Sequence, residues 1–221
     1  MDSEILLDLQ EMIIEGDHVG SRELVREALD AGLDPHTVLT QGMIPAMDVV
    51  GYRFQTGAIF IPEMLIAARA MKAGIALLQP ILGASSAAPL GTAVIGTVQG
   101  DVHDIGKNLA GLMLEGAGFK VIDLGVDVRP EQVVQTVRES GACVIGLAAL
   151  LTTTMLNMAG VIQALNEADL HHATKVLVGG APVTAGFAKE IGADGYAPDA
   201  ASGAEMARMF ALEIRAKALS A

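Results

Sequence analysis

The sequence is poor in aromatic residues and in cations. It contains no tryptophan, five phenylalanines and two tyrosines, and its 14 lysines and arginines are outnumbered by 26 aspartates and glutamates. The formal net charge is −12. Proteins that bind nucleic acid need clustered cations for the phosphates and often use aromatic rings to stack on bases. We therefore expect no nucleic-acid partner.

Long apolar runs and cysteines are also scarce. No uninterrupted apolar run approaches the roughly 20 residues that a membrane-spanning helix needs. The sequence begins Met1-Asp2-Ser3-Glu4, without the basic start of a secretory signal peptide. The single cysteine, Cys143, excludes a disulfide within the chain, and its apolar surroundings indicate a buried structural thiol. We expect a cytoplasmic protein with no membrane association.

Residues 1–84 show helical patterns only. Apolar residues recur every three or four positions, and glycines and prolines interrupt the pattern. The first expected helix ends near residue 15, and the other three cover residues 19–29, 36–53 and 62–82. Pro45 falls inside the third helix and is expected to kink it. Short connections between successive helices predict an antiparallel four-helix bundle.

Residues 92–221 show a different pattern, in which apolar runs alternate with amphipathic stretches. Residues 85–91, rich in Ser, Ala, Pro and Gly, predict a linker between the two domains. The expected strands are 92–98, 119–124, 142–148, 174–179 and 194–196, and the expected helices are 105–117, 130–140, 153–168, 184–191 and 199–218. Such alternation predicts a doubly wound parallel sheet of five strands with the flavodoxin-like order.

The loop after the first strand, Gly100 to Gly106, carries the first candidate site. Ligands bind at the carboxyl ends of the strands in open α/β sheets. A carboxylate at Asp101 can hydrogen-bond one nitrogen of His103 and leave the other nitrogen to a ligand. A histidine in such a loop is also commonly an ordinary surface residue. No second His or Cys stands at chelating spacing, so His103 would bind a metal only if a cofactor supplied the other ligands.

Two later stretches follow the third and fourth strands and would lie at the same edge of the sheet. Residues 148–155 contain three consecutive threonines, for which helix capping is the alternative explanation. Gly179-Gly180 would allow a bulky ligand to approach the backbone, although glycine pairs also form ordinary tight turns.

Together, these stretches resemble the cobalamin-binding signature D-x-H-x-x-G, S-x-L and G-G. The chain has Asp101-x-His103-x-x-Gly106, forty-one residues, Ala148-x-Leu150, twenty-eight residues, and Gly179-Gly180. Residues 42–54 and 60–64 resemble the helical cap domain of the same family. The resemblance covers essentially the whole chain. It is to the corrinoid proteins of methylamine, methanol and methoxyarene methyltransferase systems, and to the cobalamin module of methionine synthase.

The resemblance implies a cobalamin or related corrinoid, as methylcob(III)alamin or cob(I)alamin. It makes His103 the lower axial ligand of cobalt, with Asp101 holding its imidazole and Thr154 completing a proton relay. Phe54 and Ile61 would cover the upper, methyl-bearing face. The other cofactor-binding residues that it implies are Val102, Asp104, Ile105, Gly106, Ala148, Leu150, Thr152, Gly179, Gly180, Ala181, Tyr196 and Ala200.

One residue departs from the signature. Ala148 stands where the signature has serine, so the hydroxyl that would bond the base of the cofactor's nucleotide tail is missing. A hydrogen bond of this kind contributes roughly 0.5–1.5 kcal/mol, so we expect corrinoid binding to survive, with tail recognition resting on packing or on a different lower base.

The function implied is a methyl carrier without a complete active site of its own. A substrate-specific methyltransferase would load the methyl group, a second methyltransferase would pass it to a pterin or thiol, and a reductive activase is a third candidate partner. The cap would swing away with residues 85–91 as a hinge. The alternatives are a cobalamin-dependent sensor, although no DNA-binding region is visible, and an adenosylcobalamin isomerase subunit, against which the type of helical cap argues.

Overall fold

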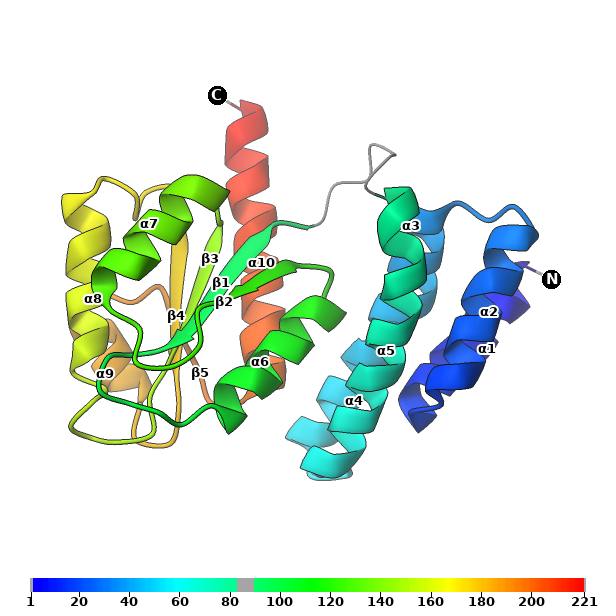
Figure 1. Cartoon of the computed structure of the whole chain (residues 1–221), viewed down its shortest axis with the longest axis horizontal. Helices are drawn as coiled ribbons and strands as arrows, with labels where there is room; N and C mark the ends of the chain where they lie inside the picture. Colours follow the sequence, from blue (N-terminus) through cyan, green and yellow to red (C-terminus); the bar gives the residue numbers. More distant parts are fainter. Residues whose placement is uncertain (1, 83–89, 221) are drawn as a thin grey trace. The chain divides into compact units, whose positions relative to one another are not determined.

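The computed structural model describes residues 2–82 and 90–220. These residues form two compact units, one made of helices alone and one built around a parallel sheet (Figure 1). Most of the predicted linker, residues 85–91, lies outside the described residues, so the domain boundaries and the hinge stay predictions. Among the described helices, none has the length and apolar character needed to cross a membrane.

The first unit confirms a helical N-terminal domain. Its elements are α1 (Asp2–Glu15), α2 (His18–Asp30), α3 (Pro35–Thr37), the π-helix η1 (Val38–Met43), α4 (Ile44–Gln55) and α5 (Ile61–Leu82). Helices α1, α2, α4 and α5 pack on one another through apolar side chains. Completely buried residues at the centre include Leu9, Ile13, Val25, Met43 and Met64. Burial of these apolar faces supplies most of the stability of such a helical unit.

The single kinked helix expected over residues 36–53 is instead divided by the π-helix. Proline has no backbone N–H, so Pro45 cannot donate to the carbonyl of Gln41, four residues earlier. The side chain of Gln10 in α1 takes that place, since its Nε2 donates to the Gln41 carbonyl at 2.8 Å. Beside it, the backbone N–H of Ile44 donates to Leu39, five residues back. A long-range contact therefore stabilises the irregular turn.

The second unit confirms the flavodoxin-like sheet, because its five parallel strands follow the order β2-β1-β3-β4-β5. The strands are β1 (Thr92–Thr97), β2 (Lys120–Asp123), β3 (Val144–Ala148), β4 (Lys175–Gly179) and β5 (Gly195–Ala197). The helices are α6 (Ile105–Gly116), α7 (Pro130–Ser140), α8 (Asn157–Glu167), α9 (Ala185–Glu190) and α10 (Ala200–Ser220).

Helices cover both faces of this sheet. Figure 1 shows α7, α8 and α9 on one face and α6 and α10 on the other. Val94, Ile145 and Val176 from three neighbouring strands pack with Met158 and Leu165 of α8, and all five are completely buried. Burial on both faces explains why the strands read as nearly continuous apolar runs.

Cys143, which directly precedes β3, is half-buried rather than fully buried. Its Sγ lies 3.5 Å from the carbonyl oxygen of Thr92, and burial raises the pKa of the thiol. The thiol is thus poorly activated as a nucleophile, which agrees with a structural role.

The carboxyl ends of β3 and β4 approach each other unusually closely. Ala148 is paired with Gly179, and the backbone N–H of Ala149 donates to the Gly179 carbonyl at 3.2 Å. Gly180 has a φ of +122°, and a Cβ atom there would lie 1.9 Å from the carbonyl oxygen of Ala149. Backbone packing thus requires glycine at position 180.

Replacing Gly180 with alanine should lower the free energy of unfolding by about 3 kcal/mol or more, because strain at positive φ adds to a backbone clash. Gly192 is the matched control, since it has a φ of +79° but no atom within 4 Å of an added Cβ. Gly192→Ala should cost about 1 kcal/mol. Urea unfolding followed by circular dichroism measures both losses. Equal losses would show that the β3–β4 approach is not tight in solution.

Candidate functional site

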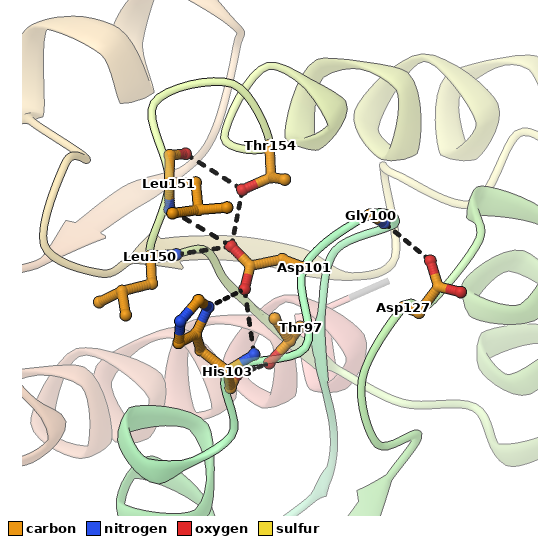
Figure 2. A network of polar contacts seen from close by, with 8 residues as sticks. All are labelled: Thr97, Gly100, Asp101, His103, Asp127, Leu150, Leu151 and Thr154. Atoms are coloured by element: carbon orange, nitrogen blue, oxygen red, sulfur yellow. Dashed lines mark hydrogen bonds and ion pairs between the residues drawn. The ribbon is translucent and has the colours of Figure 1, made fainter.

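The strand order reverses between β1 and β3, and the loops that follow these two strands carry the site. In doubly wound sheets, ligands bind at this reversal, outside the carboxyl ends of the strands. The β1 loop contributes Asp101 and His103, and the β3 loop contributes Leu150 and Thr154 (Figure 2). The structure therefore brings together the predicted residues from two signature motifs.

Asp101 is the centre of the polar network, and its side chain is completely buried. One carboxylate oxygen, Oδ1, accepts from the backbone N–H of His103 at 3.1 Å and is 2.7 Å from its ring Nδ1. The other, Oδ2, accepts from the backbone N–H groups of Leu150 (2.8 Å) and Leu151 (3.3 Å) and from the Thr154 hydroxyl (2.6 Å). Both oxygens are fully used by donors from two loops.

These donors decide the charge of Asp101. Burial alone would raise the pKa of the carboxyl, but hydrogen bonds from Thr154, Leu150 and His103 outweigh that effect and hold the pKa far below its ordinary value. Asp101 is thus ionised near neutral pH and can only accept hydrogen bonds.

The tautomer of His103 follows from that charge. An acceptor-only carboxylate 2.7 Å from Nδ1 requires the ring proton to sit on Nδ1, which leaves the lone pair of the neutral ring on Nε2. The side chain is 47% exposed, and Nε2 has no hydrogen bond to any residue that the structure describes. The loop therefore presents one oriented, accessible imidazole nitrogen.

Thr154 does not cap a helix. The helix expected from residue 153 begins only at Asn157, and residues 152–156 form turns. No side chain caps the start of α8, because the N-cap position is Leu156. The turns bring two backbone N–H groups and the Thr154 hydroxyl onto the buried carboxylate of Asp101, and this contact displaces the helix start.

Three further residues hold the loop and were not among the predicted site residues. The Thr97 hydroxyl donates to the His103 carbonyl at 2.8 Å, and the Asn157 side chain donates to the backbone of the same loop at 2.7 Å. The Asp127 carboxylate accepts from the Gly100 N–H at 2.7 Å. The position of Asp127 just after an apolar strand was the available signal, since carboxyl-end loops converge in this fold.

The other predicted residues lie at several places. In the sheet unit, Ala148 ends β3, Gly179 ends β4, Gly180 and Ala181 follow it, Thr152 lies in the β3 loop, Tyr196 lies in β5 and Ala200 begins α10. Tyr196 is partly buried and packs against the core. Phe54 near the end of α4 and Ile61 at the start of α5 belong to the helical unit.

The surroundings of His103 fit a large, partly apolar cofactor. Exposed apolar side chains gather on the two loops and on the first turn of α6: Val102, Ile105, Leu150, Leu151 and Leu156. A Cβ added to Gly106 would meet no atom within 4 Å, so a ligand has room beside the backbone there. Within residues 2–82 and 90–220, no cluster of three or more metal-ligating side chains occurs.

Fold and site together define a class of protein. A flavodoxin-like sheet presents a single oriented imidazole nitrogen beside exposed apolar side chains. This surface suits a protein that binds a large cofactor at the carboxyl edge of its sheet.

Comparison with known proteins identifies the family. The models of two B12 binding domains match residues 91–205 and 5–79. A corrinoid protein of Desulfitobacterium hafniense is 43% identical over 210 residues, which cover 94% of this chain and 97% of that protein. Trimethylamine corrinoid protein 2 of Methanosarcina acetivorans is 43% identical over 199 residues, which cover 89% and 92%.

A solved structure agrees with these relatives. The methanol:cobalamin methyltransferase complex MtaBC from Methanosarcina barkeri contains a chain that is 31% identical, with a TM-score of 0.83. The match covers 95% of this chain and 80% of that one. The protein therefore belongs to the corrinoid proteins of methylamine and methanol methyltransferase systems. This confirms the predicted class: a methyl carrier that binds a corrinoid.

Replacing Thr154 with valine should lower the free energy of unfolding at neutral pH by about 2 kcal/mol, because a hydrogen bond to a charged group is lost. Because folding lowers the pKa of Asp101, the stabilisation that its donors provide is fully present above about pH 4. It is lost as the pH falls toward the folded-state pKa. The difference from the wild type should therefore shrink in acid. Urea unfolding at neutral pH and at steps down to about pH 2 measures it, because Asp101 is still ionised in the folded protein at about pH 3.

Thr152→Val is the matched control for this measurement. Thr152 lies two residues away in the same loop and is exposed. Its replacement should change the unfolding free energy by less than about 0.5 kcal/mol. Equal effects of the two variants would contradict the role of the Thr154 hydroxyl.

Proposed function

We propose that His103, through Nε2, is the one protein ligand to the metal of the corrinoid, and that Asp101 and Thr154 hold it for that purpose. The contact between Asp101 and Nδ1 carries this proposal, because it leaves an unbonded lone pair on an exposed nitrogen. When bound, the corrinoid supplies the cobalt on which the methyl group travels.

The polar network also places a charged partner beside the ring of His103. When Nε2 is not coordinated it can accept a proton, and the resulting imidazolium would face an ionised carboxylate. The Thr154 hydroxyl donates to the same carboxylate from its other side and keeps it in place. Asp101 and Thr154 therefore act through His103 and need no contact with the cofactor.

We assign the rest of the cofactor's binding surface to the carboxyl edge of the sheet. Residues of the first motif surround the ring, and residues at the ends of β3, β4 and β5 hold the nucleotide tail. The ring set is Val102, Asp104, Ile105 and Gly106, and the tail set is Ala148, Leu150, Thr152, Gly179, Gly180, Ala181, Tyr196 and Ala200. Their places on adjoining strand ends support this assignment. Phe54 and Ile61 of the helical unit are assigned to the upper face.

The partners we propose are two methyltransferases. One loads the methyl group from a specific donor, the other passes it to a pterin or thiol, and a reductive activase restores the carrier. The MtaBC complex, which pairs a similar chain with a methanol:cobalamin methyltransferase, supports the first partner. Similarity to trimethylamine and dimethylamine corrinoid proteins makes methylamines the first donors to test. Methyl transfer to the reduced holoprotein, assayed with each donor and its methyltransferase, should succeed with one donor class and fail with mismatched enzymes.

Replacing His103 with alanine should abolish the imidazole-coordinated visible spectrum of the bound corrinoid while some corrinoid remains bound. Added imidazole should restore the spectrum, because it can occupy the vacated position. His172→Ala is the control, since His172 is also exposed and pairs with an aspartate, Asp169, at 3.3 Å. An unchanged spectrum in the His103 variant would refute the ligand assignment.

Replacing Ala148 with serine should strengthen binding of cobalamin by about threefold to tenfold, the value of one recovered hydrogen bond to the tail base. Cobinamide, which lacks that base, serves as the control ligand and should bind both proteins equally. Titration of the apoprotein followed by absorbance measures both affinities. Equal gains in affinity for the two ligands would show that the tail base does not bind next to residue 148.

A further inference from the structure

Lys107 is a buried cation just four residues after His103. It lies in the first turn of α6, and its residue is 4% exposed. Its ammonium donates to the Asp123 carboxylate and to the Asn108 side chain, the latter at 2.6 Å. A buried ammonium is costly unless it is paired in this way, so the contact must have a role in the fold or the site.

Direct contact with a ligand does not explain Lys107. A lysine that binds a phosphate or an amide of a cofactor keeps its ammonium accessible, whereas the Lys107 side chain is 3% exposed. Its two partners, Asp123 and Asn108, are exposed residues of the protein itself. The residue therefore acts on the site through other residues.

One route leads from Lys107 to the loop before His103. Asp123 ends β2, and its second oxygen accepts from the Gly125 N–H at 2.8 Å, at the start of the β2 loop. In that same loop, the N–H of Asp127 donates to the carbonyl of Asp101 at 3.0 Å. The ion pair thus joins the first turn of α6 to the segment that holds Asp101.

A second route leads to the residue after His103. Asn108, which accepts from Lys107, donates through Nδ2 to the Asp104 carboxylate at 3.2 Å. The backbone N–H of Asn108 also donates to the Asp104 carbonyl at 2.8 Å. Hydrogen bonds therefore hold the chain on both sides of His103, at Asp101 and at Asp104, and Lys107 contributes to both sets.

We propose that Lys107 is a positioning residue: the ion pair between its buried ammonium and the partly exposed Asp123 carboxylate fixes the start of α6 against the β2 loop and keeps His103 Nε2 aimed at the metal of the corrinoid. This inference rests on the proposed role of His103 as the ligand. It predicts that loss of the ion pair weakens coordination by His103 although Lys107 touches neither His103 nor the cofactor.

Lys107→Met in the holoprotein tests the inference. The ratio of uncoordinated to imidazole-coordinated corrinoid should rise by about threefold or more, as expected when one of two coupled groups is lost. Electron paramagnetic resonance of the cobalt(II) form reads this ratio directly, through the splitting by an axial nitrogen. Asp123→Asn should give a similar rise, and the double variant should add little to either single one.

Lys175→Met is the matched control. Lys175 also forms a partly buried pair with an aspartate, Asp194, at 2.6 Å, but it lies at the amino end of β4, at the opposite edge of the same sheet. Its loss should lower the unfolding free energy and leave the coordinated fraction unchanged. This separates general destabilisation from an effect on His103.

The possible results distinguish the two proposals. If the wild type shows no axial nitrogen, or matches His103→Ala, the ligand assignment itself fails. If the wild type is coordinated and both Lys107→Met and Asp123→Asn keep its ratio, the role of Lys107 is overturned and that of His103 stands. Should Lys107→Met not fold, Asp123→Asn, which keeps the side-chain volume, decides alone.

Discussion

The buried carboxylate of Asp101 is the interaction on which the site depends. An ionised group with no exposed surface is stable only when its oxygens are fully hydrogen-bonded, and three of its donors come from residues about fifty positions further along the chain. The same carboxylate therefore joins the β1 and β3 loops, displaces the start of α8 and fixes the proton of His103 on Nδ1. Folding of the two loops therefore also fixes the orientation of the His103 ring.

This arrangement suits a carrier more than an enzyme. The chain supplies one accessible imidazole nitrogen, a polar network around Asp101 and an apolar edge in which Val102 and Ile105 are more than 70% exposed. Exposed apolar surface of this kind marks a place that a ligand or partner covers. The carboxylate of Asp101 is fully occupied by its donors, so it is not free to act as a base on a substrate.

The sequence predicted what local patterns determine. The five strands, their order and the meeting of Asp101, His103 and Thr154 at one edge followed from apolar periodicity and from the signature. The start of α8 and the π-helix could not be predicted, because each depends on a single distant contact: Asp101 for the first, and the Gln10 side chain on Gln41 for the second. The burial of Lys107 in α6 also depends on a contact with another element, because its partner Asp123 lies at the end of β2.

The signature itself combines two kinds of constraint. Gly180 is required by the backbone of Ala149 whether or not a ligand is present, so the second glycine of the G-G motif reports how β3 and β4 pack. His103 has no comparable packing role, because its ring is half exposed and its Nε2 is unbonded, so its presence must be explained by what it binds. Ala148 falls between these cases: its backbone keeps the strand pairing with Gly179, and only the side-chain hydroxyl is lost. A chain can therefore depart from the signature at position 148 and keep both its fold and the contact between Asp101 and His103.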